Sequence, residues 1–124
     1  MPLIKDLSSI PDLTVVSPAE YDLRVITAKE VLSKNTGRNS IMLVCEIVGE
    51  ENAQNLIHSI WLPMESDDET KAGTMWRMIK DFTVALGLEG DLELDDFKNL
   101  EFTAVLEIEK FEDYGDRNII KRIT

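Results

Sequence analysis

One segment with helical periodicity stands among segments in which apolar and polar residues alternate, and this feature of the sequence most limits its fold. Residues 21–32, 41–48, 56–62, 100–110 and 118–123 are short apolar stretches, and the clearest of them alternate apolar with polar side chains. A period of two is typical of β-strands that bury one face. Residues 69–86 instead repeat apolar side chains at helical spacing. The sequence therefore predicts three strands, one helix and two further strands.

The first two strands show their predicted inner faces most clearly. Tyr21, Leu23 and Val25 alternate with polar residues, and the phase blurs over 26–28, which predicts a bulge or a bend. Turn residues over 33–39 separate this strand from the next. The face of the second strand that is expected to be buried consists of Ile41, Leu43, Cys45 and Ile47.

The helix is predicted to begin at a capping box, in which Ser66 accepts from the first turn and Glu69 reaches back. Gly87 marks its end. Trp76 is assigned to core packing, and a short helical turn is expected to start at Asp95. The predicted apolar stripe of the helix comprises Met75, Met78, Ile79, Phe82, Ala85 and Leu86.

This order of elements is that of the five-stranded Greek-key OB barrel, with one α-helix between strands 3 and 4. A length of 124 residues suits one domain. We expect an N-terminal arm over residues 1–19, with one short strand around 13–16, and an OB-fold domain over residues 20–124.

Charge is unevenly distributed along the chain. The formal net charge is −11, yet residues 1–45 carry five basic and five acidic side chains and sum to zero. Because a polyanion repels a strongly acidic protein, any nucleic-acid surface must be a local patch. One cysteine, no secretory signal and no bilayer-spanning run predict a cytoplasmic protein without membrane contact, in the host cytoplasm if it is viral.

The sequence favours a protein that is not an enzyme and needs no cofactor or metal. His58 is the only histidine and stands in the middle of a predicted strand, and Cys45 falls on a core face. No cysteine or histidine spacing fits zinc, and the acidic run 65–69 is better explained as a helix start than as a metal loop.

Proteins hold single-stranded nucleic acid with cations and aromatic faces, and residues in three parts of the sequence fit these roles. Lys29, Lys34 and Arg38 lie on or after the first strand, although a solvated hairpin tip explains this turn equally well. Trp61 points outward if Leu56 and Ile60 face the core, and it is then a stacking platform; the alternative is packing under the helix or the arm. The far border of the expected nucleic-acid-binding groove is assigned to Tyr114, Arg117 and Lys121. The alternative is that Tyr114 is a simple turn residue.

Several segments, in order, resemble the phage-encoded OB-fold single-stranded DNA-binding proteins. They are residues 19–25, 34–37 and 41–47, the helix end Ala85-Leu86-Gly87, residues 102–105 and residues 114–118. The chain departs from that pattern in two ways: Asn99-Leu100-Glu101, just before the fourth strand, has no glycine, and residues 119–124 are not the acidic tail through which many such proteins recruit partners.

The resemblance implies a non-catalytic, largely sequence-independent single-stranded DNA-binding protein of DNA replication or recombination, with proteins of those processes as further partners. The net charge supports an alternative, an acidic OB-type interaction module or DNA mimic that does not bind nucleic acid. The outward Met42, Val44 and Ile57 are assigned either to a homodimer face or to the binding groove, so the oligomeric state stays open.

Overall fold

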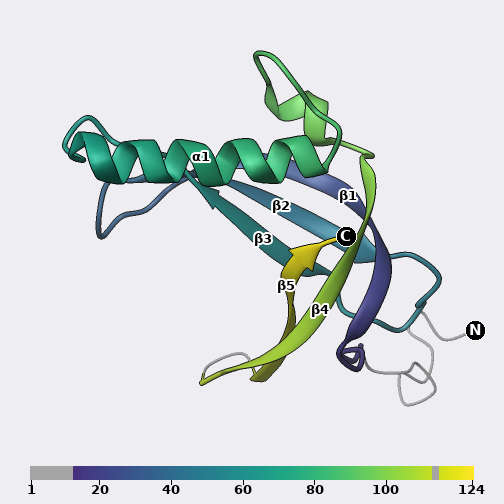
Figure 1. Ribbon diagram of the computed structural model, residues 1–124. Helices are drawn as coiled ribbons and strands as arrows, with labels where there is room; N and C mark the ends of the chain where they lie inside the picture. The colour runs from purple at the N-terminus through teal and green to yellow at the C-terminus, as the bar shows by residue number, and fades with distance from the viewer. Residues whose placement is uncertain (1–12, 113–114) are drawn as a thin grey trace, which may run out of the picture.

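The computed structural model describes residues 13–112 and 115–124, which form five β-strands, one α-helix and a short 3-10 helix (Figure 1). In chain order these elements are β1 (Ala19–Leu32), β2 (Asn39–Ile47), β3 (Leu56–Trp61), α1 (Glu69–Ala85), η2 (Leu94–Phe97), β4 (Glu101–Phe111) and β5 (Gly115–Ile123). The predicted order of strands and helix is confirmed. The predicted short helical turn is also present, but it begins at Leu94 with Glu93 as its N-cap and not at Asp95.

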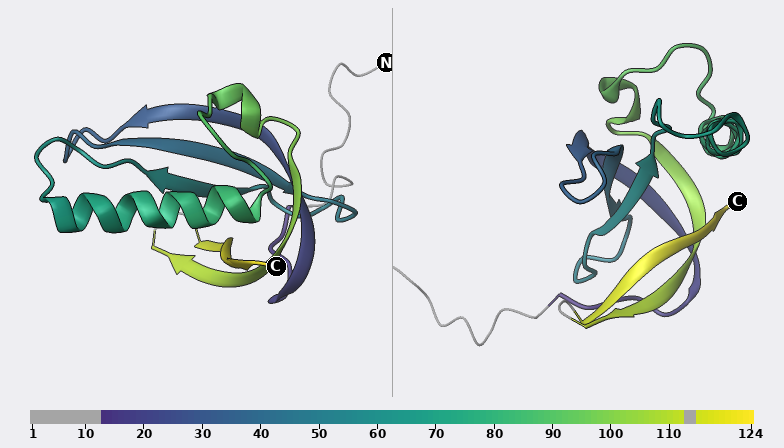
Figure 2. Two further views of the ribbon diagram at one scale, coloured as in Figure 1. Left: turned by 45° about the horizontal axis from the view of Figure 1, so that its top comes forward. Right: turned by 90° about the vertical axis from the view of Figure 1, so that its left-hand side faces the viewer.

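The five strands form one open, entirely antiparallel sheet in the order β3-β2-β1-β4-β5. The sheet curves until its edge strands β3 and β5 contact each other (Figure 2). The protein is therefore mainly β, with an OB-like barrel and α1 inserted between β3 and β4, as the sequence predicts.

The length of β1 allows it to serve both halves of the barrel. Its first six residues pair with β4, and Leu23–Leu32 pair with β2. The register with β2 shifts between Val25 and Thr27, within the stretch where the sequence predicts a bulge. A bulge bends a strand and increases its twist, which turns β1 from one half of the sheet toward the other.

The core lies inside this curved sheet. Five of its side chains are almost fully buried, namely Leu23, Val25, Leu43, Cys45 and Leu106. Each buried aliphatic side chain contributes about 1.5–3 kcal/mol relative to exposure. Burial also raises the pKa of the Cys45 thiol to about 12, so this residue behaves as a small apolar side chain, as predicted.

The start of α1 differs from the prediction. The N-cap is Asp68, whose Oδ1 accepts a hydrogen bond from the Lys71 backbone N–H at 2.7 Å. The predicted capping box at Ser66 is therefore wrong, because the helix begins two residues later than that box requires. The helix ends at Leu86, followed by Gly87 with φ 79°, as predicted.

The predicted apolar stripe of α1 is only partly correct. Phe82 and Ile79 pack against the core, and Leu86 belongs to it. Met78 is 66% exposed and Trp76 is 57% exposed, so their assignment to the core is wrong. The helix crosses one end of the barrel (Figure 2). Its residues that are not exposed form a narrow strip, which consists of Ala72, Met75, Ile79, Phe82 and Thr83.

The N-terminal arm is described only from Leu13 onward. In place of a strand over 13–16, Thr14 forms one isolated parallel bridge with Ala53. The arm is held instead by Asn118, whose side chain hydrogen-bonds both the N–H and the carbonyl of Val16. Over residues 13–112 and 115–124, no helix is long and apolar enough to cross a membrane.

Candidate nucleic-acid interface

Nine side chains on β1, β2 and β3 point to one side of the sheet, which we call the outer face; eight of them are at least partly exposed, and Ser40 is buried. The strand registers align them in three rows across the sheet, and the alternate residues face the core. The rows are Thr27–Val44–Ile57, Lys29–Met42–Ser59 and Val31–Ser40–Trp61. This part of the sheet, strands 2 and 3, is where OB folds bind oligonucleotides.

The outer face contains no carboxylate, although the chain has 24 acidic residues. Its one charged side chain is Lys29, which is exposed and lies at the β1 end of its row, opposite Met42. Glu46 lies on the same side of β2, just beyond Val44, and is in an ion pair with Arg24. The face is thus apolar and weakly cationic within a strongly acidic protein.

Trp61 ends one row of the outer face and is 48% exposed, as its predicted outward orientation requires. Its indole borders a cleft of about 330 Å³. The other residues that line this cleft come from the β1–β2 turn and from α1, and they are Ser33, Thr36, Arg38, Lys71 and Met75. Proteins hold single-stranded nucleic acid with aromatic side chains and cations, and this cleft contains both, although Arg38 and Lys71 each pair with Asp67.

Arg38 has a structural role that sequence reasoning missed. Its guanidinium makes two hydrogen bonds of 2.8 Å to the carboxylate of Asp67 and one of 2.9 Å to the Leu62 carbonyl. Asp67 also accepts from the Met64 N–H and lies 3.5 Å from the Lys71 ammonium. These donors hold the pKa of Asp67 well below its usual range, with the Arg38 hydrogen bonds as the main cause. Phosphate contact by Arg38 stays a prediction, and the structure assigns its guanidinium to holding the β1–β2 turn against the start of α1.

The opposite end of the outer face meets the β4–β5 hairpin. A cavity of about 410 Å³ lies there between β3 and β5. Ile57, 54% exposed, and Phe111, 38% exposed, form its apolar walls, and Arg117 provides a cation. The Arg117 guanidinium donates to Gln54 Oε1, which orients it at this edge. The cavity gives the outer face a second aromatic side chain.

The remaining predicted residues have different surroundings. Lys34 is exposed at the tip of the β1–β2 turn, where no described carboxylate pairs with it. Lys121 lies 3.2 Å from Glu107 on the neighbouring strand, so its charge is already partly neutralised. Tyr114 lies outside the described residues. The structure thus brings Lys29, Lys34, Arg38 and Trp61 to one region and places Arg117 at the other end of the same face.

Sequence reasoning missed Phe111 and Lys71. Phe111 follows Glu107 and Glu109 on the solvent side of β4, and an aromatic side chain in that series is the signal that could have found it. Lys71 offers no such signal, because its position beside Trp61 depends on how α1 docks on the barrel.

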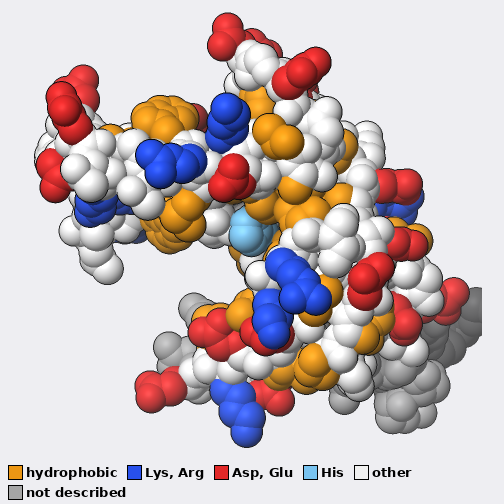
Figure 3. All heavy atoms as spheres, viewed as in Figure 1, with side chains coloured by type: hydrophobic (Ala, Val, Ile, Leu, Met, Phe, Trp, Pro, Cys, Tyr) orange, Lys and Arg blue, Asp and Glu red, His pale blue; other side chains and the backbone are white. Residues whose placement is uncertain are grey.

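A wide cleft separates α1 from the β4–β5 hairpin, and the single histidine lies at its base (Figure 3). His58 stacks on Phe82 of α1, with ring centroids 4.6 Å apart and an interplanar angle of 15°. Burial lowers the pKa of His58. These contacts give His58 a packing role between β3 and α1. In the described part of the chain, no three acidic, histidine or cysteine side chains gather as metal ligands would.

The fold and this surface define a class, an OB-like barrel whose outer face on β1, β2 and β3 carries an exposed tryptophan and one lysine. The chain belongs to the DUF669 family, described as proteins of unknown function, whose match covers residues 5–107. No curated protein matches the sequence.

Proposed function

We propose that this protein is a non-catalytic, largely sequence-independent single-stranded DNA-binding protein that acts in DNA replication or recombination, in the cytoplasm of a phage-infected host. The observation that carries the proposal is the outer face, which combines exposed Trp61 and Ile57 with Lys29 and lacks any carboxylate. An acidic protein that avoids acidic groups on one face provides a surface that a polyanion can approach.

In this proposal the bases of the single strand stack on aromatic side chains of the protein. Its phosphates contact cations at both ends of the outer face. Trp61 provides one stacking surface, and the cavity beside Phe111 receives a base at the other end. Lys29, Lys34 and Arg117 contact phosphates. Trp61 and Ile57 are four residues apart on β3, which corresponds to roughly 13 Å along the strand. Each OB fold of this kind holds about 4–16 nucleotides.

The test is binding of a labelled oligo-dT strand, measured by fluorescence anisotropy at low and moderate salt with a duplex of equal length as control. We expect saturable binding to the single strand that weakens with salt, because counterions are released from the phosphates. Equal binding to the duplex, or no binding at micromolar protein in low salt, would contradict the proposal.

The alternative function is an acidic OB-type interaction module or DNA mimic that does not bind nucleic acid. Its support is the net charge of −11, because all the acidic side chains lie outside the outer face. In that case Met42, Val44 and Ile57 form a contact with a protein, including a second copy of this chain. Sedimentation with and without oligo-dT separates the two cases, because under the alternative the protein sediments as a dimer or with its protein partner and oligo-dT leaves its sedimentation unchanged.

A further inference from the structure

A second surface lies on a different part of the molecule, between α1 and the segment that leads to β4. It is a groove of about 660 Å³, a volume within the range of ligand pockets. Its floor is the end of the barrel core, including Ile41, Ile60 and Phe97. One wall is α1 and the other is residues 88–94, which stand away from the helix (Figures 1 and 2). We call this surface the α1 groove.

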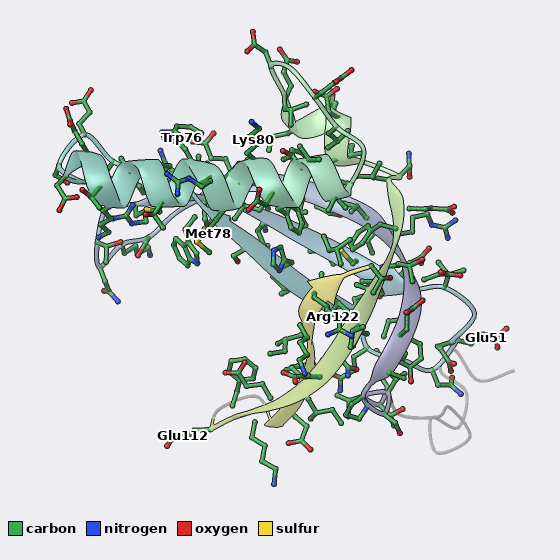
Figure 4. The ribbon with its side chains drawn as sticks, in the orientation of Figure 1. Glu51, Trp76, Met78, Lys80, Glu112 and Arg122 are labelled. Atoms are coloured by element: carbon green, nitrogen blue, oxygen red, sulfur yellow. The ribbon has the colours of Figure 1, made fainter. Side chains whose placement is uncertain are left out.

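Apolar side chains on the α1 wall of the groove are exposed to solvent. Trp76 and Val84 are 57% and 60% exposed, and with Lys80 they follow one face of the helix at intervals of four residues. Figure 4 shows Trp76 and Lys80 on the side of α1 nearest η2, opposite to Met78. Exposed apolar side chains that rim a hollow of this size are typical of a protein-interaction site.

The other wall is strongly acidic. Residues 89–96 contain no basic side chain and five carboxylates, namely Glu89, Asp91, Glu93, Asp95 and Asp96. Three of these five, Glu89, Asp91 and Glu93, line the groove, and Glu30 of β1 adds a fourth acidic side chain to it. No described cation forms an ion pair with any of those four, and Lys80 is the single basic residue in the lining.

We propose that the α1 groove binds a basic amphipathic segment of a partner protein. Apolar side chains of that segment fill the space between Trp76, Val84 and the barrel end, and its lysine or arginine side chains face the carboxylates of residues 89–93. Apolar anchors in a concave groove give affinity, and complementary charge at the rim gives specificity and a fast approach. The same carboxylates repel nucleic acid, so this surface and the outer face take ligands of opposite charge.

This inference does not depend on single-stranded DNA binding, and the experiment keeps the two apart. Short random peptides displayed on particles are selected on the full chain, with counter-selection on the Trp76→Ala/Val84→Lys double variant. Both side chains are more than half exposed, so the variant is expected to fold, which circular dichroism checks. The enriched peptides are then made with a fluorescent label, and their affinity is measured by anisotropy.

We expect a basic consensus with at least two apolar residues, and a loss of about tenfold or more in affinity for the double variant. Met78→Lys, on the opposite flank of α1, is the matched control and should keep the affinity. Glu89→Gln/Asp91→Asn/Glu93→Gln should weaken binding and reduce its salt dependence. Absence of enrichment over the double variant, a neutral or acidic consensus, or equal binding to all variants would overturn the proposal. Weaker oligo-dT binding by the Trp76→Ala/Val84→Lys double variant would also overturn it, because the two ligands would then share one surface.

Discussion

The outer face and the α1 groove are alike in what they expose and opposite in charge. Each has one tryptophan and one aliphatic side chain about half exposed: Trp61 at 48% and Ile57 at 54% on the outer face, Trp76 at 57% and Val84 at 60% on the groove. The outer face has one cation and no carboxylate, whereas four carboxylates line the groove. Exposed apolar side chains therefore indicate that a surface binds something, and the local charge indicates which class of ligand it accepts. A net charge for the whole chain would hide this difference.

The two tryptophans offer the sharpest test of this comparison. Trp61→Ala should weaken oligo-dT binding by roughly 5-fold to 150-fold, because one stacked base is worth about 1–3 kcal/mol. Trp76→Ala removes an equally exposed indole from the other surface and should leave oligo-dT binding unchanged. Anisotropy titrations of both variants measure the effect. Similar losses in the two variants would remove the distinction between the surfaces.

Adding a carboxylate tests the absence of acidic groups from the outer face. Ile57→Glu should weaken oligo-dT binding by about tenfold, through repulsion of phosphates and loss of an apolar contact. Val84→Glu places the same group at a similarly exposed position in the α1 groove, and we expect no effect on DNA affinity. If Val84→Glu weakens the binding as much as Ile57→Glu does, long-range charge and not a local face controls the affinity.

Lys29→Ala should have a smaller effect that is clearest in the salt dependence. Removal of one phosphate contact should lower affinity by a few fold and reduce the slope of log K against log salt by about 0.7. Lys98→Ala is the control, because the Lys98 ammonium already pairs with Asp95 at 3.2 Å, away from the outer face. An unchanged slope for Lys29→Ala would exclude this residue from the interface.

The Arg38–Asp67 ion pair joins the β1–β2 turn to α1 and should be visible in the pH dependence of stability. Because the folded-state pKa of Asp67 lies below its unfolded value, its contribution is present above about pH 4 and is lost as the pH falls further. Asp67→Asn removes this contribution. The difference in Tm between wild type and Asp67→Asn, measured by circular dichroism, should therefore narrow below about pH 4. A constant difference between pH 7 and pH 3 would contradict the assignment.

Local patterns in the sequence predicted most of the fold. Alternation located all five strands, the bulge near Ile26 and the burial of Cys45, because these depend on which residues share one side of a strand. The outward position of Trp61 followed from the same alternation, with Ile60 on the core side. The stacking role of Trp61 and the phosphate contacts remain predictions.

The parts that failed depend on how distant segments pack. Helical spacing placed Met78 in the core, and Trp76 was also assigned there, but both side chains are more than half exposed because α1 contacts the barrel along a narrow strip. The pairing of Arg38 with Asp67, and the cavity between Ile57 and Phe111, each join residues that are far apart in the sequence. No local pattern carries such information, so the site could be predicted in outline but not in its contacts.

The central claim is that two separate surfaces accept ligands of opposite charge. Its most direct test is a titration of isotope-labelled protein followed by backbone amide NMR, first with oligo-dT and then with a basic peptide selected on the α1 groove. We predict that oligo-dT shifts the amides of Lys29, Met42, Ser59 and Trp61, and that the peptide shifts those of Lys80, Val84 and residues 88–93. Shifts from oligo-dT at residues 84–93, or none on β2 and β3, would contradict the claim.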